Sequence, residues 1–207
     1  MPGSFTQRAA MQTSVTQAFE TPNSALGWAR QVAIVVGATV FIALCARVTV
    51  PLPFTPVPLT LQDFAVLLVG LTLGARRGFA ALVLYLAEGV SGMPVFNPLG
   101  RGGVAQLLGP TGGFLIAYPF VAALAGWVLS TGKNTFAKAA TAGLLAELAL
   151  FAGGVSQLAL LTHSLSYALR AGLYPFIPGA VIKIMFAAGV ASGSRWIYNT
   201  TVRKVLP

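Results

Sequence analysis

Apolar residues occur in six runs along the chain, and each is long enough, or nearly so, to form a helix that crosses a bilayer. A transmembrane helix needs about 20 predominantly apolar residues, with a range of about 17–25. Two of the runs are short and are separated by a Gly-Ala-Arg-Arg-Gly turn at 74–78; we keep them as two spans because charges are costly within a bilayer. The predicted spans are 28–49, 59–74, 76–92, 112–130, 135–161 and 175–198.

The composition is typical of a polytopic membrane protein. Of the 207 residues, 56% are hydrophobic and 8% are charged, and the mean hydropathy is +0.80. A soluble domain carries roughly 25% charged residues, whereas a charge at the centre of a transmembrane helix costs about 2.5–3.5 kcal/mol on insertion scales. We therefore expect an all-α fold, a bundle of six transmembrane helices over residues 28–207 with ligand-binding outer loops.

Residues 1–27 differ from the rest of the chain, because they are polar and rich in Ser, Thr and Gln. They lack the charged region followed by a compact apolar region that marks a cleaved signal peptide. We expect this segment to be a disordered cytoplasmic tail.

The positions of the basic residues predict the orientation in the membrane. Lys and Arg are enriched in cytoplasmic loops, and six spans place both termini on one side. The basic residues on that side are Arg8, Arg30, Arg76, Arg77, Lys133, Lys138, Arg195, Arg203 and Lys204, whereas Arg47, Arg101 and Arg170 lie opposite. We therefore predict a plasma-membrane protein with cytoplasmic termini. The net charge of +9 is spread over loops, so we expect membrane lipid and no nucleic acid as a partner.

The loop 93–113, MPVFNPLGRGGVAQLLGPTGG, is the first candidate for a ligand site. Irregular backbone at membrane depth is tolerated only where protein buries it or where it lines a cavity. Arg101 lies between Gly100 and Gly102, so the backbone can come close to whatever the guanidinium binds. We predict that Arg101 binds a carboxylate; the alternative is an arginine that meets water or lipid headgroups.

A proline-rich loop precedes the second span and forms the second candidate. Four prolines in 50–60 forbid a continuous helix and restrict their neighbours to extended conformations. This stiff element is either a lid over a ligand or a packed re-entrant connector. Gln62 follows it and offers both a donor and an acceptor to an amide-like ligand, while Asp63 complements the dipole of the helix that begins there.

Lys183 lies about eight residues into the last predicted helix. An ionisable residue within a membrane helix is a functional candidate unless it can reach the interface. We predict that Lys183 pairs with a ligand, or with Glu88 or Glu147.

No catalytic set assembles from the sequence. The chain has no GxSxG or HExxH motif, no acidic cluster for a metal, and one cysteine, Cys45, within an apolar run. We therefore expect no catalytic residues, no metal, no cofactor and no enzymatic activity. The alternative from another class is an intramembrane enzyme that uses Glu147 or Lys183.

Small residues at Ala29, Ala33 and Gly37 form a stripe with a spacing of four along the first helix. Such a stripe lets another helix backbone approach closely. The spacing fits docking of a partner protein and packing within the bundle equally well.

Six segments together resemble the BioY family, whose members are biotin-specific substrate-binding (S) components of energy-coupling factor (ECF) transporters. The resemblance covers roughly residues 28–195. The segments are TPVPLTLQ at 55–62, LTLG at 71–74, MPVF at 93–96, GRGG at 100–103, LLGPTGGFL at 107–115 and FIPGAVIK at 176–183.

The resemblance implies biotin uptake through a site on the outer side of the membrane. It implies that Arg101 binds the valerate carboxylate, that Gln62, Asn97 and Lys183 bind the ureido group, and that Phe54, Tyr85 and Phe96 contact the thiophane ring. It also implies two partners, a transmembrane coupling (T) component and a pair of cytosolic ATPases, with Ala29, Ala33 and Gly37 as the docking surface.

One position departs from the family pattern PGDxxK, because Ala180 stands where the family has an acidic residue. Either another group, such as Asn97 or a backbone carbonyl, accepts the ureido N–H groups, or the protein prefers a related ligand. The alternative within transport is therefore an S component for another vitamin-like ligand.

Overall fold

The computed structural model describes the backbone of residues 25–132 and 135–205. Most of the predicted tail, residues 1–24, lies outside the described residues. The longer helices are α2 (Ala25–Arg47), α3 (Gln62–Leu73), α4 (Ala75–Val90), α6 (Gly112–Ser130), α7 (Phe136–Thr162) and α9 (Ile177–Val205). Each of the six predicted runs overlaps one of these helices, so the predicted all-α fold is confirmed.

Shorter elements were not predicted. They are β1 (Thr49–Val50), β2 (Leu59–Thr60), α5 (Gly103–Leu107), α8 (Leu165–Gly172) and the 3-10 turn η1 (Tyr174–Phe176). The strands pair antiparallel, with Thr49 opposite Thr60. The predicted bounds of the first two spans were therefore too wide at this loop, because the chain next to the prolines is extended and pairs as a hairpin instead of continuing either helix.

The helices pack around α6, which contacts α3, α4 and α7, while α7 in turn contacts α8 and α9. Small residues permit the close packing. A Cβ added to Gly70 of α3 would lie 2.5 Å from the carbonyl oxygen of Ala122 in α6. Only glycine allows the two helix backbones to approach this closely, as is common between membrane helices.

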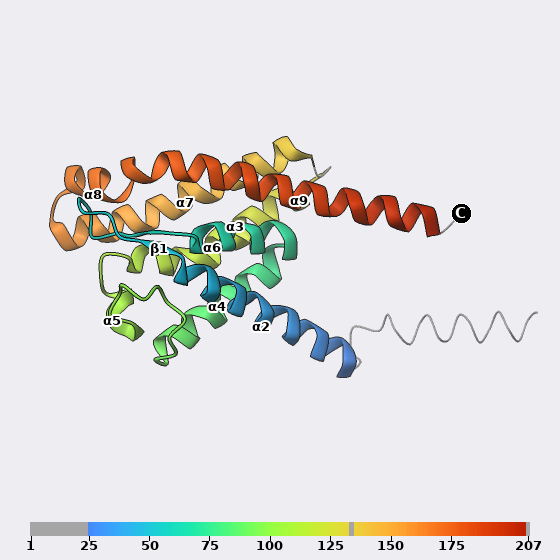
Figure 1. Cartoon of the computed structure of the whole chain (residues 1–207), viewed down its shortest axis with the longest axis horizontal. Helices are drawn as coiled ribbons and strands as arrows, with labels where there is room; N and C mark the ends of the chain where they lie inside the picture. The colour runs from blue at the N-terminus through green and yellow to red at the C-terminus, as the bar shows by residue number, and fades with distance from the viewer. Residues whose placement is uncertain (1–24, 133–134, 206–207) are drawn as a thin grey trace, which may run out of the picture.

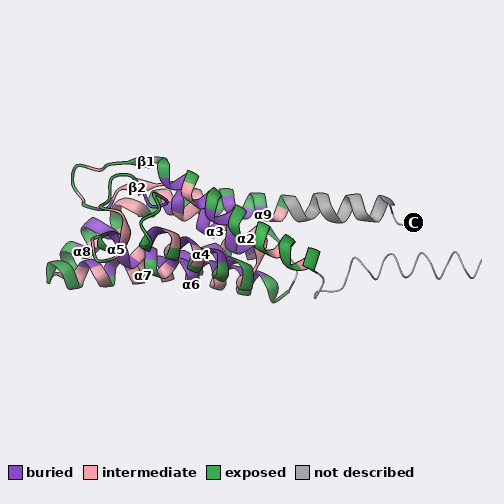
Figure 2. Ribbon diagram, turned by 90° about the horizontal axis from the view of Figure 1, so that it is seen from below, coloured by how far each residue is buried: buried purple, intermediate pink, exposed green. Residues whose placement is uncertain are grey.

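Apolar side chains also cover the outside of the bundle, where Figure 2 shows exposed residues along the helices. Leu160, Phe186 and Trp127 are exposed over 75%, 67% and 60% of their surface. Large exposed apolar surfaces mark contacts with protein or membrane. Among the described residues, the segments long and apolar enough to cross a bilayer are 25–47, 112–130, 136–162 and 165–193, and α3 is a shorter apolar helix. The chain is a multi-pass membrane protein.

The first residues of α2 and the last residues of α9 lie at the same end of the molecule, and the hairpin, α5 and α8 lie at the opposite end (Figure 1). The two loops singled out in the sequence therefore gather at one end of the bundle.

Candidate functional site

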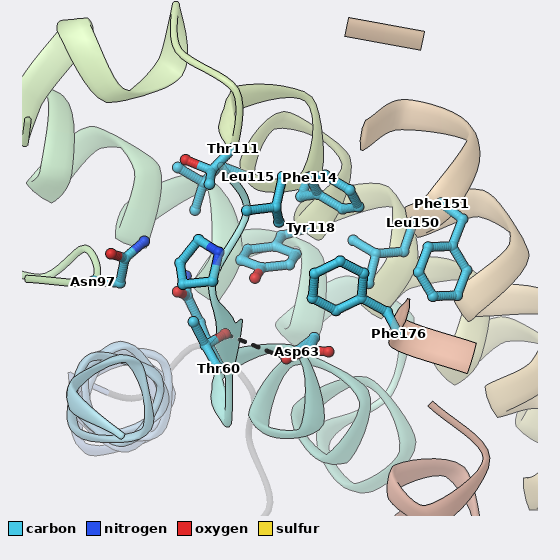
Figure 3. Close-up of a pocket in the computed structure, with 13 residues that line it drawn as sticks. Thr60, Asp63, Asn97, Thr111, Phe114, Leu115, Tyr118, Leu150, Phe151 and Phe176 are labelled. Atoms are coloured by element: carbon cyan, nitrogen blue, oxygen red, sulfur yellow. Dashed lines mark hydrogen bonds between the residues drawn. The ribbon is translucent and has the colours of Figure 1, made fainter. Parts of the chain in front are cut away.

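A small cavity of about 50 Å³, here called the inner pocket, lies just inside the loop end of the bundle. Aromatic rings from α6, α7 and η1 lie along one side, and Asn97 lies on the other (Figure 3). Thr60 and Asp63 complete its polar wall near the start of α3. The full lining is Val57, Pro58, Thr60, Gln62, Asp63, Asn97, Thr111, Phe114, Leu115, Tyr118, Leu150, Phe151 and Phe176.

A larger open cleft, here called the outer cleft, adjoins the inner pocket. Its volume is about 850 Å³, within the range of about 300–1,000 Å³ of small-molecule sites. The two cavities share Pro58, Asn97 and Thr111 in their walls. Arg101 lines the outer cleft, together with Gly100 and Gln106. The two cavities therefore lie on either side of a shared wall, with Arg101 in the outer cleft and the amide and carboxyl groups in the inner pocket.

The loop that carries Arg101 is held in place by side chains of the helices. The Arg47 guanidinium of α2 donates to the carbonyl of Pro94, and the Gln157 amide of α7 donates to the carbonyls of Leu107 and Gly109, both at 2.8 Å. These bonds satisfy carbonyl groups that have no partner within a helix. Such groups need a partner in the protein because no water is available inside a bilayer.

Gln106 is only 2% exposed and contacts the middle of this loop. Its amide oxygen accepts the N–H of Gly102 at 3.1 Å. A Cβ on Gly100 would lie 2.4 Å from the same amide, so the backbone beside the exposed Arg101 lies directly on Gln106.

Gln62 and Asn97 are buried and line the inner pocket, as expected of ligand-binding amides. The Gln62 Nε2 donates to the Tyr85 hydroxyl at 2.9 Å. The Asn97 Oδ1 accepts the N–H of Leu99 at 3.1 Å. Each side chain is thus anchored by one bond.

The three aromatic residues assigned to a ligand ring lie outside the walls of both cavities. Phe54 is 63% exposed, whereas Tyr85 and Phe96 are buried and meet edge to face, with ring centroids 5.5 Å apart. Tyr85 faces inward because its hydroxyl donates to the carbonyl of Val95 at 2.8 Å. The structure therefore gives Tyr85 and Phe96 a supporting position behind the site.

Lys183 of α9 does not line the inner pocket itself, but it pairs with Asp63, which does. Its ammonium group pairs with the Asp63 carboxylate at 2.5 Å and donates to the carbonyl of Thr60 at 2.8 Å. The sequence-based prediction of Glu88 or Glu147 as the protein partner is wrong, because the start of α3 lies beside α9 and brings Asp63 to Lys183.

The two glutamates have different surroundings. Glu88 of α4 accepts a hydrogen bond from the Thr39 hydroxyl at 3.1 Å. Glu147 of α7 is 2% exposed, and both of its carboxyl oxygens lack a hydrogen-bond partner within the described part of the chain. The described residues contain no group of three or more His, Cys, Asp or Glu side chains that could hold a metal ion.

The small-residue stripe of α2 lies on the outside of the bundle. Ala29, Ala33 and Gly37 are all exposed, and a Cβ on Gly37 would meet no described atom within 4 Å. The surface is therefore open to lipid or to a partner rather than used for packing within the bundle.

Sequence reasoning missed most of the aromatic wall and the part that Asp63 plays in it. Phe114 and Tyr118 lie one turn apart on α6, and Phe176 lies in η1. In an apolar helix nothing in the pattern separates a cavity-facing aromatic residue from a core residue. The one available signal was Phe176, which precedes the Pro-Gly at the start of α9.

Comparisons with known proteins agree with one another. The chain is 38% identical over 136 residues to a probable biotin transporter of Pyrococcus horikoshii, covering 66% of this chain and 79% of that protein. It is 35% identical over 153 residues to a biotin transporter of Thermotoga maritima, covering 74% and 88%.

A crystal structure of the S-component for biotin from an ECF-type ABC transporter superposes with a TM-score of 0.74 at 28% identity, covering 83% of this chain and 94% of that one. The sequence model of the BioY family matches residues 11–200. The chain therefore belongs to the BioY family.

Proposed function

We propose that this protein binds biotin at the outer side of the membrane and delivers it inward as the S component of an ECF-type transporter. The relatives are named biotin transporters, and the structural neighbour is titled the S-component for biotin. The observation that carries the proposal is the pair of adjoining cavities, with a cation in the outer cleft and amide groups in the inner pocket.

The two ends of biotin match the two ends of this site. The valerate carboxylate pairs with Arg101, since a guanidinium is the strongest carboxylate donor among side chains. The ureido group is directed toward Gln62 and Asn97, which supply amide donors and acceptors. The thiophane ring packs on the rings of the inner pocket, Phe114, Tyr118 and Phe176, rather than on Phe54, Tyr85 or Phe96.

The inner pocket is small for a bicyclic ring system at about 50 Å³. Binding therefore moves side chains at the shared wall of Pro58, Asn97 and Thr111, so that the ring enters from the outer cleft. Rotamer changes of this kind are common on binding.

The chain binds its substrate and is not an enzyme. Energy for transport comes from partners, a T component in the membrane and a pair of cytosolic ATPases. The exposed stripe Ala29, Ala33 and Gly37 is the proposed docking surface for the T component. The proposed location is the plasma membrane with both termini in the cytoplasm, in line with the charge distribution.

Equilibrium binding to the purified, detergent-solubilised protein tests the substrate. The panel contains biotin, thiamine, riboflavin and lipoate, and each is added to protein whose thermal unfolding is measured in parallel. Biotin is expected to bind far more tightly than the other three. Saturable binding of another vitamin with no binding of biotin would overturn the proposal.

A further inference from the structure

The carboxylate of Asp63 lies in the wall of the inner pocket. Among the described residues, Asp63 is the only acidic residue in the wall of the inner pocket or the outer cleft. Its side chain keeps 20% of its surface exposed. The other polar side chains of the inner pocket carry amides and hydroxyls, which are weaker acceptors than an ionised carboxylate.

The hydrogen bonds of Asp63 leave part of its acceptor capacity unused. An ionised carboxylate has about four lone-pair sites on its two oxygens. Oδ2 accepts a hydrogen bond from the Lys183 ammonium group at 2.5 Å, and Oδ1 accepts a long hydrogen bond of 3.4 Å from the Thr60 hydroxyl. The two protein donors are side chains, the Thr60 hydroxyl from β2 and the Lys183 ammonium group from α9. The dashed line in Figure 3 marks the Thr60 bond at the pocket wall.

Lys183 and Thr60 hold the carboxylate in place. A charge within a membrane protein is retained only where it is paired or functional. Lys183 also donates to the carbonyl of Thr60 at 2.8 Å, so one ammonium group fixes both the carboxylate and the strand beside it.

Position 180 contributes no acceptor. Ala180 is buried, one helical turn before Lys183 on α9. Residues three apart on a helix share a face, so an acidic side chain at this position would reach the same ammonium group. In this chain the acid that pairs with Lys183 is Asp63, on a different helix.

We infer that Asp63 is the ligand-binding residue that accepts the N–H groups of the substrate's cyclic urea, with Lys183 and Thr60 as its positioning residues. This inference rests on the proposed function, because it assumes biotin as the ligand. It assigns Lys183 to holding Asp63 rather than to direct contact with the ligand.

The test compares the binding of biotin and lipoate to the full-length protein in detergent. Lipoate shares a five-membered sulfur ring and a valerate chain with biotin but has no ureido group. Asp63→Asn is expected to weaken biotin binding by about tenfold or more, since a hydrogen bond to a charged group is worth about that factor. Any lipoate binding should stay unchanged.

Glu147→Gln is the matched control. Glu147 is also a buried carboxylate, yet it lies outside both cavity walls. Its variant is expected to bind biotin as the wild type does. Loss of biotin binding in this variant with retention in Asp63→Asn would assign the acceptor to Glu147 and overturn the inference.

A second variant covers the case in which Asp63→Asn fails to fold. Asp63→Asn combined with Ala180→Asp returns a carboxylate to Lys183 from α9 and is expected to restore folding and biotin binding. Folded Asp63→Asn protein, which has no other acid at the pocket, should bind biotin weakly. Wild-type affinity in folded Asp63→Asn would overturn the inference and leave the proposed function intact, whereas absence of biotin binding by the wild type would overturn the proposed function itself.

Discussion

The Gln62 amide donates a hydrogen bond to the Tyr85 hydroxyl across 2.9 Å and so joins the inner pocket to the loop that carries Arg101. The same hydroxyl donates to the carbonyl of Val95, at the start of that loop, across 2.8 Å. All of these groups lie in the interior, with Tyr85 and Gln62 at 0% and 1% exposure. One phenol therefore fixes two separate parts of the site.

Tyr85→Phe is expected to lower both stability and affinity. The change leaves the Gln62 amide and the Val95 carbonyl without their partner, and an unsatisfied buried polar group costs about 1–3 kcal/mol. Thermal unfolding and biotin titration of the purified variant measure the two effects. Tyr118→Phe is the matched control for stability, because its hydroxyl faces the inner pocket (Figure 3) and should contribute less to unfolding. Equal unfolding temperatures for the wild type and Tyr85→Phe would contradict this role.

Gly100→Ala should disturb the Arg101 loop. The added Cβ would lie 2.4 Å from the Gln106 side chain, which must move and give up its bond to the N–H of Gly102. Biotin affinity is expected to fall while the unfolding temperature changes little. Gly109→Ala, in the same cleft, meets its nearest atoms at 3.4 Å and serves as the control. Equal affinities of the two variants would show that the loop position does not depend on this contact.

A bulky residue at Ala33 should separate binding from transport. Ala33→Phe blocks the small-residue surface of α2 but lies on the exposed side of the helix, so biotin binding to the isolated protein should be unchanged. Uptake by cells that also contain the T component and ATPases should be lost. Val32→Phe, exposed on a neighbouring face of α2, should preserve uptake. Loss of binding and uptake together in Ala33→Phe would instead indicate a role in folding.

Glu147→Leu should raise the unfolding temperature. The glutamate places two unpartnered carboxyl oxygens in the described interior, and replacing such a group by an apolar one of similar size removes a desolvation cost of about 1–3 kcal/mol. Glu88→Leu should give no such gain, because Glu88 is only half-buried and already accepts a hydrogen bond from the Thr39 hydroxyl. A drop in stability for Glu147→Leu would mean that Glu147 has a structural partner.

The helices were predictable from the sequence because a long run of apolar residues is enough to indicate a membrane helix. The contacts across the site were not predictable. Lys183 and Asp63 are 120 positions apart, and no local pattern indicates that the start of α3 lies beside α9. The presence of Asp63 at the start of a helix was already explained by the helix dipole, so its pairing with Lys183 was not expected.

The polar residues of the site were easier to predict than the aromatic ones. Gln62 and Arg101 stand out because polar groups are rare and costly in such a chain, whereas Asn97 was expected only from the resemblance to the family. Tyr85 was expected to face the ligand, yet its hydroxyl finds a carbonyl partner on the inner side. Phe114 and Tyr118 are hidden among the many apolar residues of α6, where any of the helix faces could have lined the cavity.

The central claim is that biotin spans the site with its carboxylate at Arg101, and it is tested by titrating the wild type and Arg101→Ala with biotin and biotin methyl ester. The wild type should prefer the free acid by about tenfold or more, as expected for a charge-assisted hydrogen bond. The variant should lose this preference, because the ester and the acid then meet the same uncharged wall. An unchanged preference in the folded variant would contradict the claim.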